Sequence, residues 1–282
     1  FSNKLICIAS NSISHEKLLE IDMDQSSNIF SPIKSIPKEL FSYFKAESYW
    51  FRGYSKKNTH SWIYKPFVLN NEKPPLLLRV HGGPTSVFEG VLNLEVQYWV
   101  SRGWFVAEVN YGGSSGFGKE YRERLNNYWG ILDSYDCICL VESLIENKLI
   151  DPSKIIISGN SAGGFTALNS IINNDLFAAA VCKYPVTDLN EMRLKTHRFE
   201  RNYLNSLIGE FENNQSRYFE RSPKNNIEKI TKPILIFHGK KDPVVNFKNS
   251  LDLNKKLLEK KVHSKIFIFD DEGHGFKNRN NK

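Results

Sequence analysis

Short apolar runs alternate with longer amphipathic stretches along most of the chain. The runs have the length and composition of buried parallel strands. They lie at residues 76–80, 104–109, 154–158, 178–184, 233–237 and 264–269. Residues 131–148 and 250–261 are helical in pattern and lie between strands. This alternation predicts an α/β domain with a mostly parallel sheet and helices on both faces.

Two regions depart from this alternation. In residues 1–45, strand-like runs at 5–9 and 17–21 are separated by Ser and Asn turns, which predicts antiparallel β structure. Residues 188–221 are polar and helical in texture, are interrupted by Gly209, and intervene between two predicted strands. That position places the segment to cap or border a site at the edge of the sheet.

The most specific local motif is the pentapeptide 159–163 (GNSAG), which fits Gly-x-Ser-x-Gly around Ser161. A strand precedes it and a helix follows it, which is the arrangement of the nucleophile elbow of α/β-hydrolases. The sharp turn holds the serine in a strained backbone conformation with its hydroxyl exposed. Gly159 and Gly163 lack side chains that would keep the helix from packing close to the strand. The pattern also arises by chance in loops, but these flanks favour an elbow.

A serine nucleophile needs a base, and in this fold the chain order is Ser, then Asp or Glu, then His. Of the seven histidines, His274 has a suitable position, because it follows the strand at 264–269 in a glycine-flanked loop. Such a loop can carry the imidazole over the serine from the carboxyl edge of the sheet. His263 precedes the same strand and would lie at the opposite edge. We therefore assign His274 as the general base.

The third member of a triad is a carboxylate that fixes the histidine tautomer and stabilises the imidazolium. Asp242 follows the strand at 233–237 and so reaches the same edge of the sheet. Asp188, after another apolar stretch, is the alternative. Asp270 and Asp271 are too close in sequence to the histidine to orient its ring easily. We favour Asp242.

The tetrahedral intermediate of acyl transfer needs two N–H donors directed at its oxyanion. The backbone N–H of Ala162 directly follows the nucleophile at a helix N-terminus, where the helix dipole favours negative charge. Gly83, in a His-Gly-Gly-Pro loop after an earlier strand, can bring a second amide close because it has no side chain. His81 of that loop has no second metal ligand at a usable spacing. We interpret His81 as a structural histidine that braces the loop.

One further motif resembles a nucleotide site. Residues 113–119 (GSSGFGK) fit the Gly-x4-Gly-Lys core of a phosphate-binding loop. The next residue is Glu120, where such a loop needs Ser or Thr to hold magnesium. A carboxylate at this position would also repel phosphate, so we set the nucleotide interpretation aside.

A set of motifs makes the chain similar to a known family over almost its whole length. They are HGGP (81–84), NYGGSSGFG (110–118), GNSAGGF (159–165), HGKKDPVV (238–245) and DEGHGF (271–276), and residues 196–204 and 220–223 add to the likeness. Their order and spacing resemble the catalytic domain of prolyl oligopeptidase-type serine peptidases, especially the acylaminoacyl-peptidase and dipeptidyl-aminopeptidase branch. The resemblance implies an α/β-hydrolase fold and a triad of Ser161, Asp242 and His274. It also implies an oxyanion hole from the amides of Ala162 and Gly83, and short peptides as substrates.

Two places depart from the family's pattern. Many relatives carry Arg two residues after the catalytic Asp, where it contacts the substrate backbone. Here that position is Val244, so an Arg-based specificity cannot be carried over. The elbow often has an aromatic or basic residue beside the serine, whereas this one has Asn160 and Ala162. We expect the rim of the pocket to differ and the chemistry to be the same.

The resemblance also sets expectations for the two ends. In relatives a β-propeller precedes the hydrolase domain, and residues 1–45 look like its last strands. We therefore expect a propeller remnant at 1–45, marginal alone because blades bury their faces against neighbours, and an α/β-hydrolase peptidase domain at 46–282. Relatives have a closing helix where this chain stops after His274, so we expect that helix to be truncated and the sequence to be a fragment.

The formal charge of +7 does not indicate a nucleic-acid partner, because Lys and Arg are interleaved with Asn and Glu. No apolar run approaches the length of a membrane span. The four cysteines show no metal or redox spacing, which makes a reducing compartment, and so the cytoplasm, the default. With the true N-terminus expected to be absent, a targeting signal is not readable.

We interpret the chain as a serine peptidase that needs no metal or organic cofactor. One alternative keeps the same triad but hydrolyses esters or thioesters. Another is a non-catalytic interaction domain, which the complete triad argues against. The sequence does not say whether substrates have blocked or free N-termini, or which oligomer forms.

Overall fold

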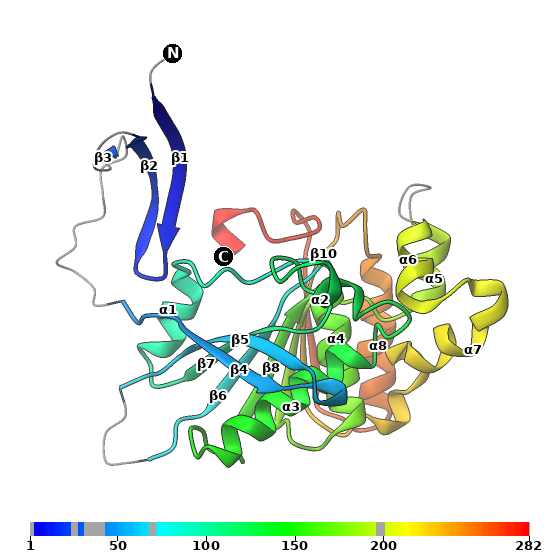
Figure 1. The fold of residues 1–282 in the computed structure, drawn as a ribbon. Coiled ribbons are helices and arrows are strands. Elements are labelled where there is room, and N and C mark those ends of the chain that lie inside the picture. The colour runs from blue at the N-terminus through cyan, green and yellow to red at the C-terminus, as the bar shows by residue number, and fades with distance from the viewer. Residues whose placement is uncertain (1–2, 24–27, 31–42, 68–71, 196–200, 282) are drawn as a thin grey trace.

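The computed structural model has an α/β architecture built around one large mixed sheet (Figure 1). It describes residues 3–23, 28–30, 43–67, 72–195 and 201–281. The first residues of the family-like stretch 196–204, residues 196–200, lie outside these ranges.

The large sheet has the strand order β11-β10-β9-β8-β6-β7-β5-β4. Its strands are β4 (Glu47–Arg52), β5 (Asn58–Tyr64), β6 (Leu76–Val80), β7 (Phe105–Asn110), β8 (Ile155–Asn160), β9 (Ala179–Lys183), β10 (Ile234–Gly239) and β11 (Ser264–Phe269). Every neighbouring pair from β11 to β7 is parallel, whereas β5 is antiparallel to both β7 and β4. The strands predicted from the apolar runs are all present, which confirms the mostly parallel sheet.

The apolar-run pattern misses β4 and β5. Both strands mix aromatic with polar residues (ESYWFR and NTHSWIY), so neither contains a continuous apolar run. β4 is the edge strand and is mostly exposed, so it needs little apolar surface. β5 lies between β4 and β7 and is mostly buried, but hydrogen bonds satisfy polar groups within it: the N–H of His60 donates to Oη of Tyr121, and Oγ of Ser61 donates to the carbonyl of Glu108.

The helices cover the two faces of the sheet unequally. They are α1 (Leu94–Val100), α2 (Lys119–Glu123), α3 (Leu132–Glu146), α4 (Ala162–Asn173), α5 (Leu189–Lys195), α6 (Arg201–Ile208), α7 (Phe211–Arg221) and α8 (Phe247–Glu259). Alternate residues of β6 show the layering: Leu76 and Leu78 belong to the core cluster that includes residues of α3, α4 and α8, whereas Leu77 belongs to the cluster that includes residues of α1 on the other face. Helices on both faces are therefore confirmed.

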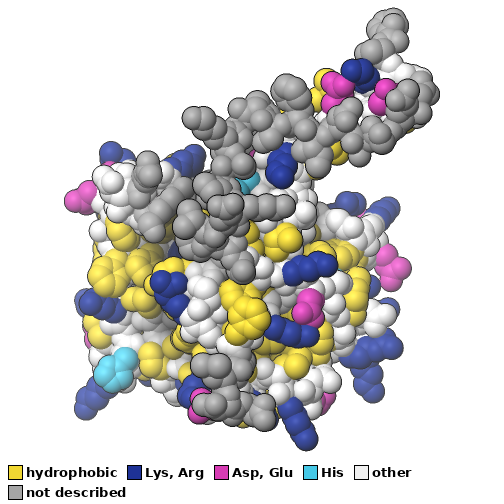
Figure 2. Space-filling model, turned by 90° about the vertical axis from the view of Figure 1, so that its left-hand side faces the viewer, with side chains coloured by type: hydrophobic (Ala, Val, Ile, Leu, Met, Phe, Trp, Pro, Cys, Tyr) yellow, Lys and Arg dark blue, Asp and Glu magenta, His cyan; other side chains and the backbone are white. Residues whose placement is uncertain are grey.

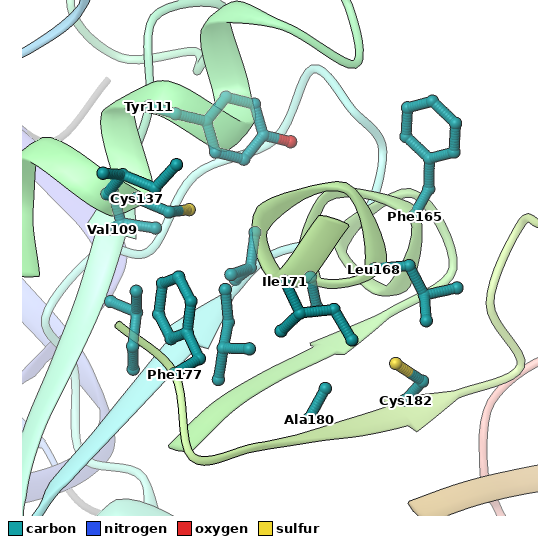
Figure 3. Packing of buried hydrophobic residues seen from close by; sticks show 14 of the residues in the cluster. Val109, Tyr111, Cys137, Phe165, Leu168, Ile171, Phe177, Ala180 and Cys182 are labelled. Atoms are coloured by element: carbon teal, nitrogen blue, oxygen red, sulfur yellow. The ribbon is translucent and has the colours of Figure 1, made fainter. Parts of the chain in front are cut away.

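The larger core lies between the sheet and helices α3 and α4. Figure 3 shows side chains of β7, α3, α4 and β9 meeting there, among them Val109, Cys137, Leu168 and Ala180. Cys137 is fully buried and burial raises the pKa of its thiol, so it serves as a small apolar side chain. Cys139 on the same helix is only half-buried, and all four cysteines are free thiols.

A separate three-stranded sheet precedes the large one. It consists of β1 (Lys4–Asn11), β2 (Ser14–Asp22) and β3 (Asn28–Phe30), and β1 and β2 project from the rest of the molecule (Figure 1). β1 pairs antiparallel with β2, as predicted. The N–H of Leu92 donates to the carbonyl of Asn11 over 2.8 Å and joins this hairpin to the body. The origin of residues 1–45 in a β-propeller, and the boundary at 45, stay predictions.

Basic side chains are dispersed over the face of the molecule shown in Figure 2. On the face shown in Figure 2, Lys and Arg lie among apolar and uncharged side chains and do not gather into one patch. Several pair with carboxylates, as Lys256 does with Asp252 at 2.9 Å. Among the described residues, no helix combines the length and apolar character needed to cross a membrane.

The carboxylate of Asp136 joins three segments near the N-terminal end of α3. One oxygen accepts the N–H of Tyr54, between β4 and β5, at 2.6 Å, and the other accepts the N–H of Gly112, after β7, at 2.7 Å. Asp136 is buried, and its burial raises its pKa to about 7, although both N–H groups favour the ionised form.

This buried carboxyl makes stability depend on pH. A pKa raised in the folded state means that the folded protein binds the proton more tightly than the unfolded chain does. The protonated carboxyl of Asp136 therefore adds to the free energy of unfolding at about pH 4, and this stabilisation is lost as pH rises through about 7. We expect Asp136→Asn to be less stable at acidic pH but to have a flatter pH dependence, by up to about 1.4 kcal/mol per pH unit.

Urea unfolding of both proteins between pH 5 and pH 7 measures this difference. Asp252→Asn is the matched control, because Asp252 is exposed and should leave the slope unchanged. Equal slopes for wild type and Asp136→Asn would show that Asp136 does not titrate in this range.

Candidate active site

Ser161 occupies the turn between β8 and α4. Its backbone has φ 53° and ψ −119°, a left-handed conformation that costs a non-glycine residue free energy. The turn is tight: a Cβ added to Gly159 would lie 2.1 Å from the carbonyl oxygen of Gly163. A Cβ added to Gly163 would lie 2.4 Å from the carbonyl oxygen of Val80 on β6. Side chains at either glycine would therefore push α4 away from the sheet.

Three residues that are far apart in sequence meet at this turn. The Nε2 atom of His274 lies 3.0 Å from the Oγ atom of Ser161. Its Nδ1 atom lies 2.8 Å from Oδ2 of Asp242. Asp242 follows β10 and His274 follows β11, so parallel strands deliver both to the carboxyl edge where β8 ends. This geometry lets the imidazole accept the serine proton while the carboxylate fixes its tautomer.

The carboxylate of Asp242 is fully buried and is satisfied on both oxygens. Oδ1 accepts the N–H groups of Val244 at 2.8 Å and Val245 at 2.9 Å. Oδ2 faces His274 and also lies 3.3 Å from Nε2 of His238. Burial alone would raise the pKa of Asp242, but the hydrogen bonds from His238, His274 and the two backbone N–H groups together hold it well below its usual range. The group is therefore an anion.

The other candidates have different surroundings. Asp188, the alternative acid, is buried and pairs with the ammonium group of Lys224. Asp270 is exposed and pairs with Lys240 at 3.1 Å. His263 precedes β11 and so lies at the amino edge of the sheet. The structure brings none of the three into contact with Ser161.

The two proposed oxyanion donors line the same cavity as the serine. Ala162 is the first residue of α4, and the N–H groups of a helix's first turn have no partner within the helix. Gly83 follows β6 and has φ 120°, where a side chain would be strained. A Cβ there would also lie 2.7 Å from the N–H nitrogen of Thr85.

His81 braces the loop that carries Gly83. Its Nδ1 donates to the carbonyl of Gly82 at 2.8 Å, and its Nε2 lies 2.8 Å from Oγ of Ser114. The ring stacks on Tyr111, with centroids 4.4 Å apart. Burial lowers the pKa of His81 to about 4, so the ring is neutral at physiological pH. Ser114 belongs to the stretch that resembles a phosphate-binding loop, and here it is buried and contacts His81 in the loop that carries Gly83.

The cavity beside the serine has a volume of about 660 Å³. Apolar walls come from Val186, Met192 and Val244, and polar groups from Asn160, Thr187, Asp188, Glu191, Asn246 and Asn249. Asp188, Glu191 and Met192 belong to the segment 188–221, which therefore borders the site as the sequence indicated.

Sequence reasoning did not single out Tyr184 or assign a role to His238. The Tyr184 ring packs against His274 with centroids 4.7 Å apart and lines the cavity. An aromatic residue at the end of a buried strand is the available signal, because β9 ends one residue before it. His238 stands four residues before Asp242, within β10, and is completely buried.

Comparisons with known proteins agree on one family. The sequence profile of the prolyl oligopeptidase family matches residues 91–282. The acylamino-acid-releasing enzyme of Arabidopsis thaliana is 30% identical over 216 residues, which are 73% of this chain and 28% of that protein. The dipeptidyl aminopeptidase BIII of Pseudoxanthomonas mexicana is 31% identical over 218 residues, which are 74% of this chain and 31% of that protein. The chain thus spans less than a third of these relatives.

Solved structures give the same result for the fold. The crystal structure of puromycin hydrolase superposes with a TM-score of 0.92 at 33% identity, covering 97% of this chain and 42% of that one. A puromycin-hydrolyzing peptidase of Mycobacterium tuberculosis also has a TM-score of 0.92, at 32% identity, covering 97% and 43%. The α/β-hydrolase-like fold predicted from the sequence is therefore confirmed.

The tight elbow yields a test. We expect Gly159→Ala to lower the free energy of unfolding by about 1–3 kcal/mol, because the new methyl group forces α4 away from β8. Chemical denaturation measures this change. Gly273→Ala is the matched control: its methyl group would meet no atom nearer than 3.7 Å, so its stability should stay close to that of wild type. Unchanged stability of Gly159→Ala would contradict the close approach of helix and strand.

Proposed function

The chain belongs to the prolyl oligopeptidase family, and from this premise we propose that it is a serine peptidase that hydrolyses short peptides by acyl transfer. The observation that carries the proposal is the continuous hydrogen-bonded series from Ser161 through His274 to Asp242, at 3.0 and 2.8 Å, beside a cavity.

Each residue has one role in the proposed reaction. The Oγ atom of Ser161 attacks the peptide carbonyl while Nε2 of His274 takes its proton. Asp242 holds the Nδ1–H tautomer and stabilises the imidazolium. The N–H groups of Gly83 and Ala162 donate to the oxyanion. His274 then protonates the departing amine, and a water molecule, deprotonated by the same imidazole, releases the acyl group from the serine.

Peptide substrates are supported by the relatives and by the cavity. One relative is named for releasing acylamino acids and another as a dipeptidyl aminopeptidase. Val186, Met192 and Val244 form apolar walls that suit an apolar side chain of the acyl-donating residue. Val244, which is 58% exposed at the rim, stands where many relatives place an arginine. Substrate binding on this side therefore depends on apolar contact instead of a charged hydrogen bond.

The decisive test is a peptide-library digest with the full chain, using acetylated and free N-termini. We expect short peptides to be cleaved, and Ser161→Ala to lose on the order of 10⁴-fold or more in rate because the nucleophile is absent. Asp242→Asn should lose about 10⁴-fold, because the histidine then has the wrong tautomer. Mass spectrometry of the products identifies both the cleaved bond and the preferred N-terminus.

Simple esters provide the counter-test. If the protein turns over p-nitrophenyl esters but not acetyl-alanyl anilide or any library peptide, it is an esterase and the peptidase proposal is wrong. If Ser161 does not react with a fluorophosphonate probe, the domain is non-catalytic.

A further inference from the structure

Asp242 contacts a second buried histidine in addition to His274. The Nε2 atom of His238 lies 3.3 Å from Oδ2 of Asp242 and 3.0 Å from the carbonyl oxygen of Val245. Its Nδ1 atom lies 2.8 Å from Oγ of Ser250 on α8. His238 and Ser250 are both completely buried, so these protein groups satisfy both ring nitrogens.

The partners of His238 assign its tautomer. A carbonyl oxygen only accepts, so the Nε2 atom that faces Val245 must carry the hydrogen. In the Nε2–H tautomer Nδ1 is an acceptor, and the hydroxyl of Ser250 donates to it. This Nε2–H donates to the carbonyl of Val245, and Oδ2 of Asp242 lies 3.3 Å from the same nitrogen. In the other tautomer, a nitrogen lone pair would face the carboxylate.

We propose that His238 is a positioning residue for catalysis: Ser250 fixes its tautomer, and its Nε2–H holds the carboxylate of Asp242 in the orientation that binds Nδ1–H of His274. This inference rests on the proposed acyl-transfer function. Asp242 then belongs to a longer series of polar contacts, which runs from Ser250 on α8 through His238, Asp242 and His274 to Ser161.

The geometry of Asp242 explains why one more donor matters. Two backbone N–H groups hold Oδ1, and they belong to the same short loop as Asp242 itself. Among the described residues, the contacts of Oδ2 are with two side chains, Nδ1 of His274 at 2.8 Å and Nε2 of His238 at 3.3 Å. His274 is partly exposed, whereas His238 is anchored in β10. His238 is therefore the fixed donor that keeps Oδ2 in place when the catalytic imidazole moves between its partners.

A buried histidine could also serve only to fill space beneath α8, and a double-mutant cycle separates the two roles. We expect His238→Leu, which keeps bulk but removes the donor, to lower the rate at which a fluorophosphonate labels Ser161 by about 10- to 100-fold. In the Asp242→Ala background, the same change should cost less than about 3-fold, because the group through which His238 acts is gone. A space-filling role costs the same factor in both backgrounds.

Two further variants sharpen the result. His238→Gln retains an amide N–H near the position of Nε2 and should label within about 3-fold of wild type. His60→Leu is the matched control, because His60 is a buried histidine on β5 that contacts a serine hydroxyl, that of Ser48, at 3.0 Å. Its effect, whatever its size, should be equal in the two Asp242 backgrounds.

Equal losses for His238→Leu in both backgrounds would overturn the proposal, as would a folded His238→Gln that is as slow as His238→Leu. If His238→Leu does not fold, Ser250→Ala decides: we expect a loss of about 3- to 10-fold in wild type and none in the His238→Gln background, because an amide has no tautomer to fix. Equal losses in both would overturn it.

The labelling rate also separates this proposal from the proposed function. It reports activation of Ser161 without requiring that any peptide be a substrate. If Ser161 is labelled but no peptide is cleaved, the proposed peptidase activity is wrong. The double-mutant cycle of His238 and Asp242 would still test the role of His238 in that case. If peptides are cleaved but His238→Leu costs the same factor in both Asp242 backgrounds, only the proposed role of His238 is wrong.

Discussion

The close approach of α4 to β8 is the constraint on which the site depends. Because Gly159 has no side chain, the carbonyl of Gly163 occupies the space where a Cβ would be. This contact forces the sharp turn that holds Ser161 at a positive φ and directs the N-terminus of α4 toward the cavity. β8 lies between β6 and β9 inside the sheet. The serine is therefore surrounded by the loops that leave the carboxyl ends of neighbouring strands, and every other catalytic group arrives by one of those loops.

The electrostatic demand of the site is met by the same loops. A buried carboxylate is costly unless hydrogen bonds replace its water. Asp242 receives two N–H groups from its own turn and side-chain donors from the ends of β10 and β11. The same contacts therefore keep the carboxylate of Asp242 ionised and hold it in place. The parallel arrangement of the strands supplies those contacts, since it places both strand ends at the same edge.

The sequence predicts what local patterns determine. Apolar runs identified the central strands, and the spacing of motifs identified Ser161, Asp242 and His274, which the structure brings into hydrogen-bonding contact. Strands β4 and β5 were not predicted because their side chains are mixed in polarity. Tyr184 escaped because its contact with His274 joins residues 90 positions apart, which no local pattern encodes. Whether the three residues perform the assigned chemistry stays a prediction that activity measurements must decide.

Two histidines show how one local pattern acquires its meaning from tertiary contacts. His81-Gly82 follows β6 and His238-Gly239 ends β10, so each is a buried histidine followed by glycine at a strand end. Each ring lies 2.8 Å from a serine hydroxyl of another segment. A buried imidazole must satisfy two nitrogens without water, so each ring ties the end of its strand to a distant element. The first contact lies at the loop of Gly83 and the second at the loop of Asp242, so the proposed oxyanion donor and the proposed acid each follow a strand end that is anchored by a buried histidine. The sequence places both histidines directly after predicted strands, but only the fold shows that they are buried and which loop each one holds.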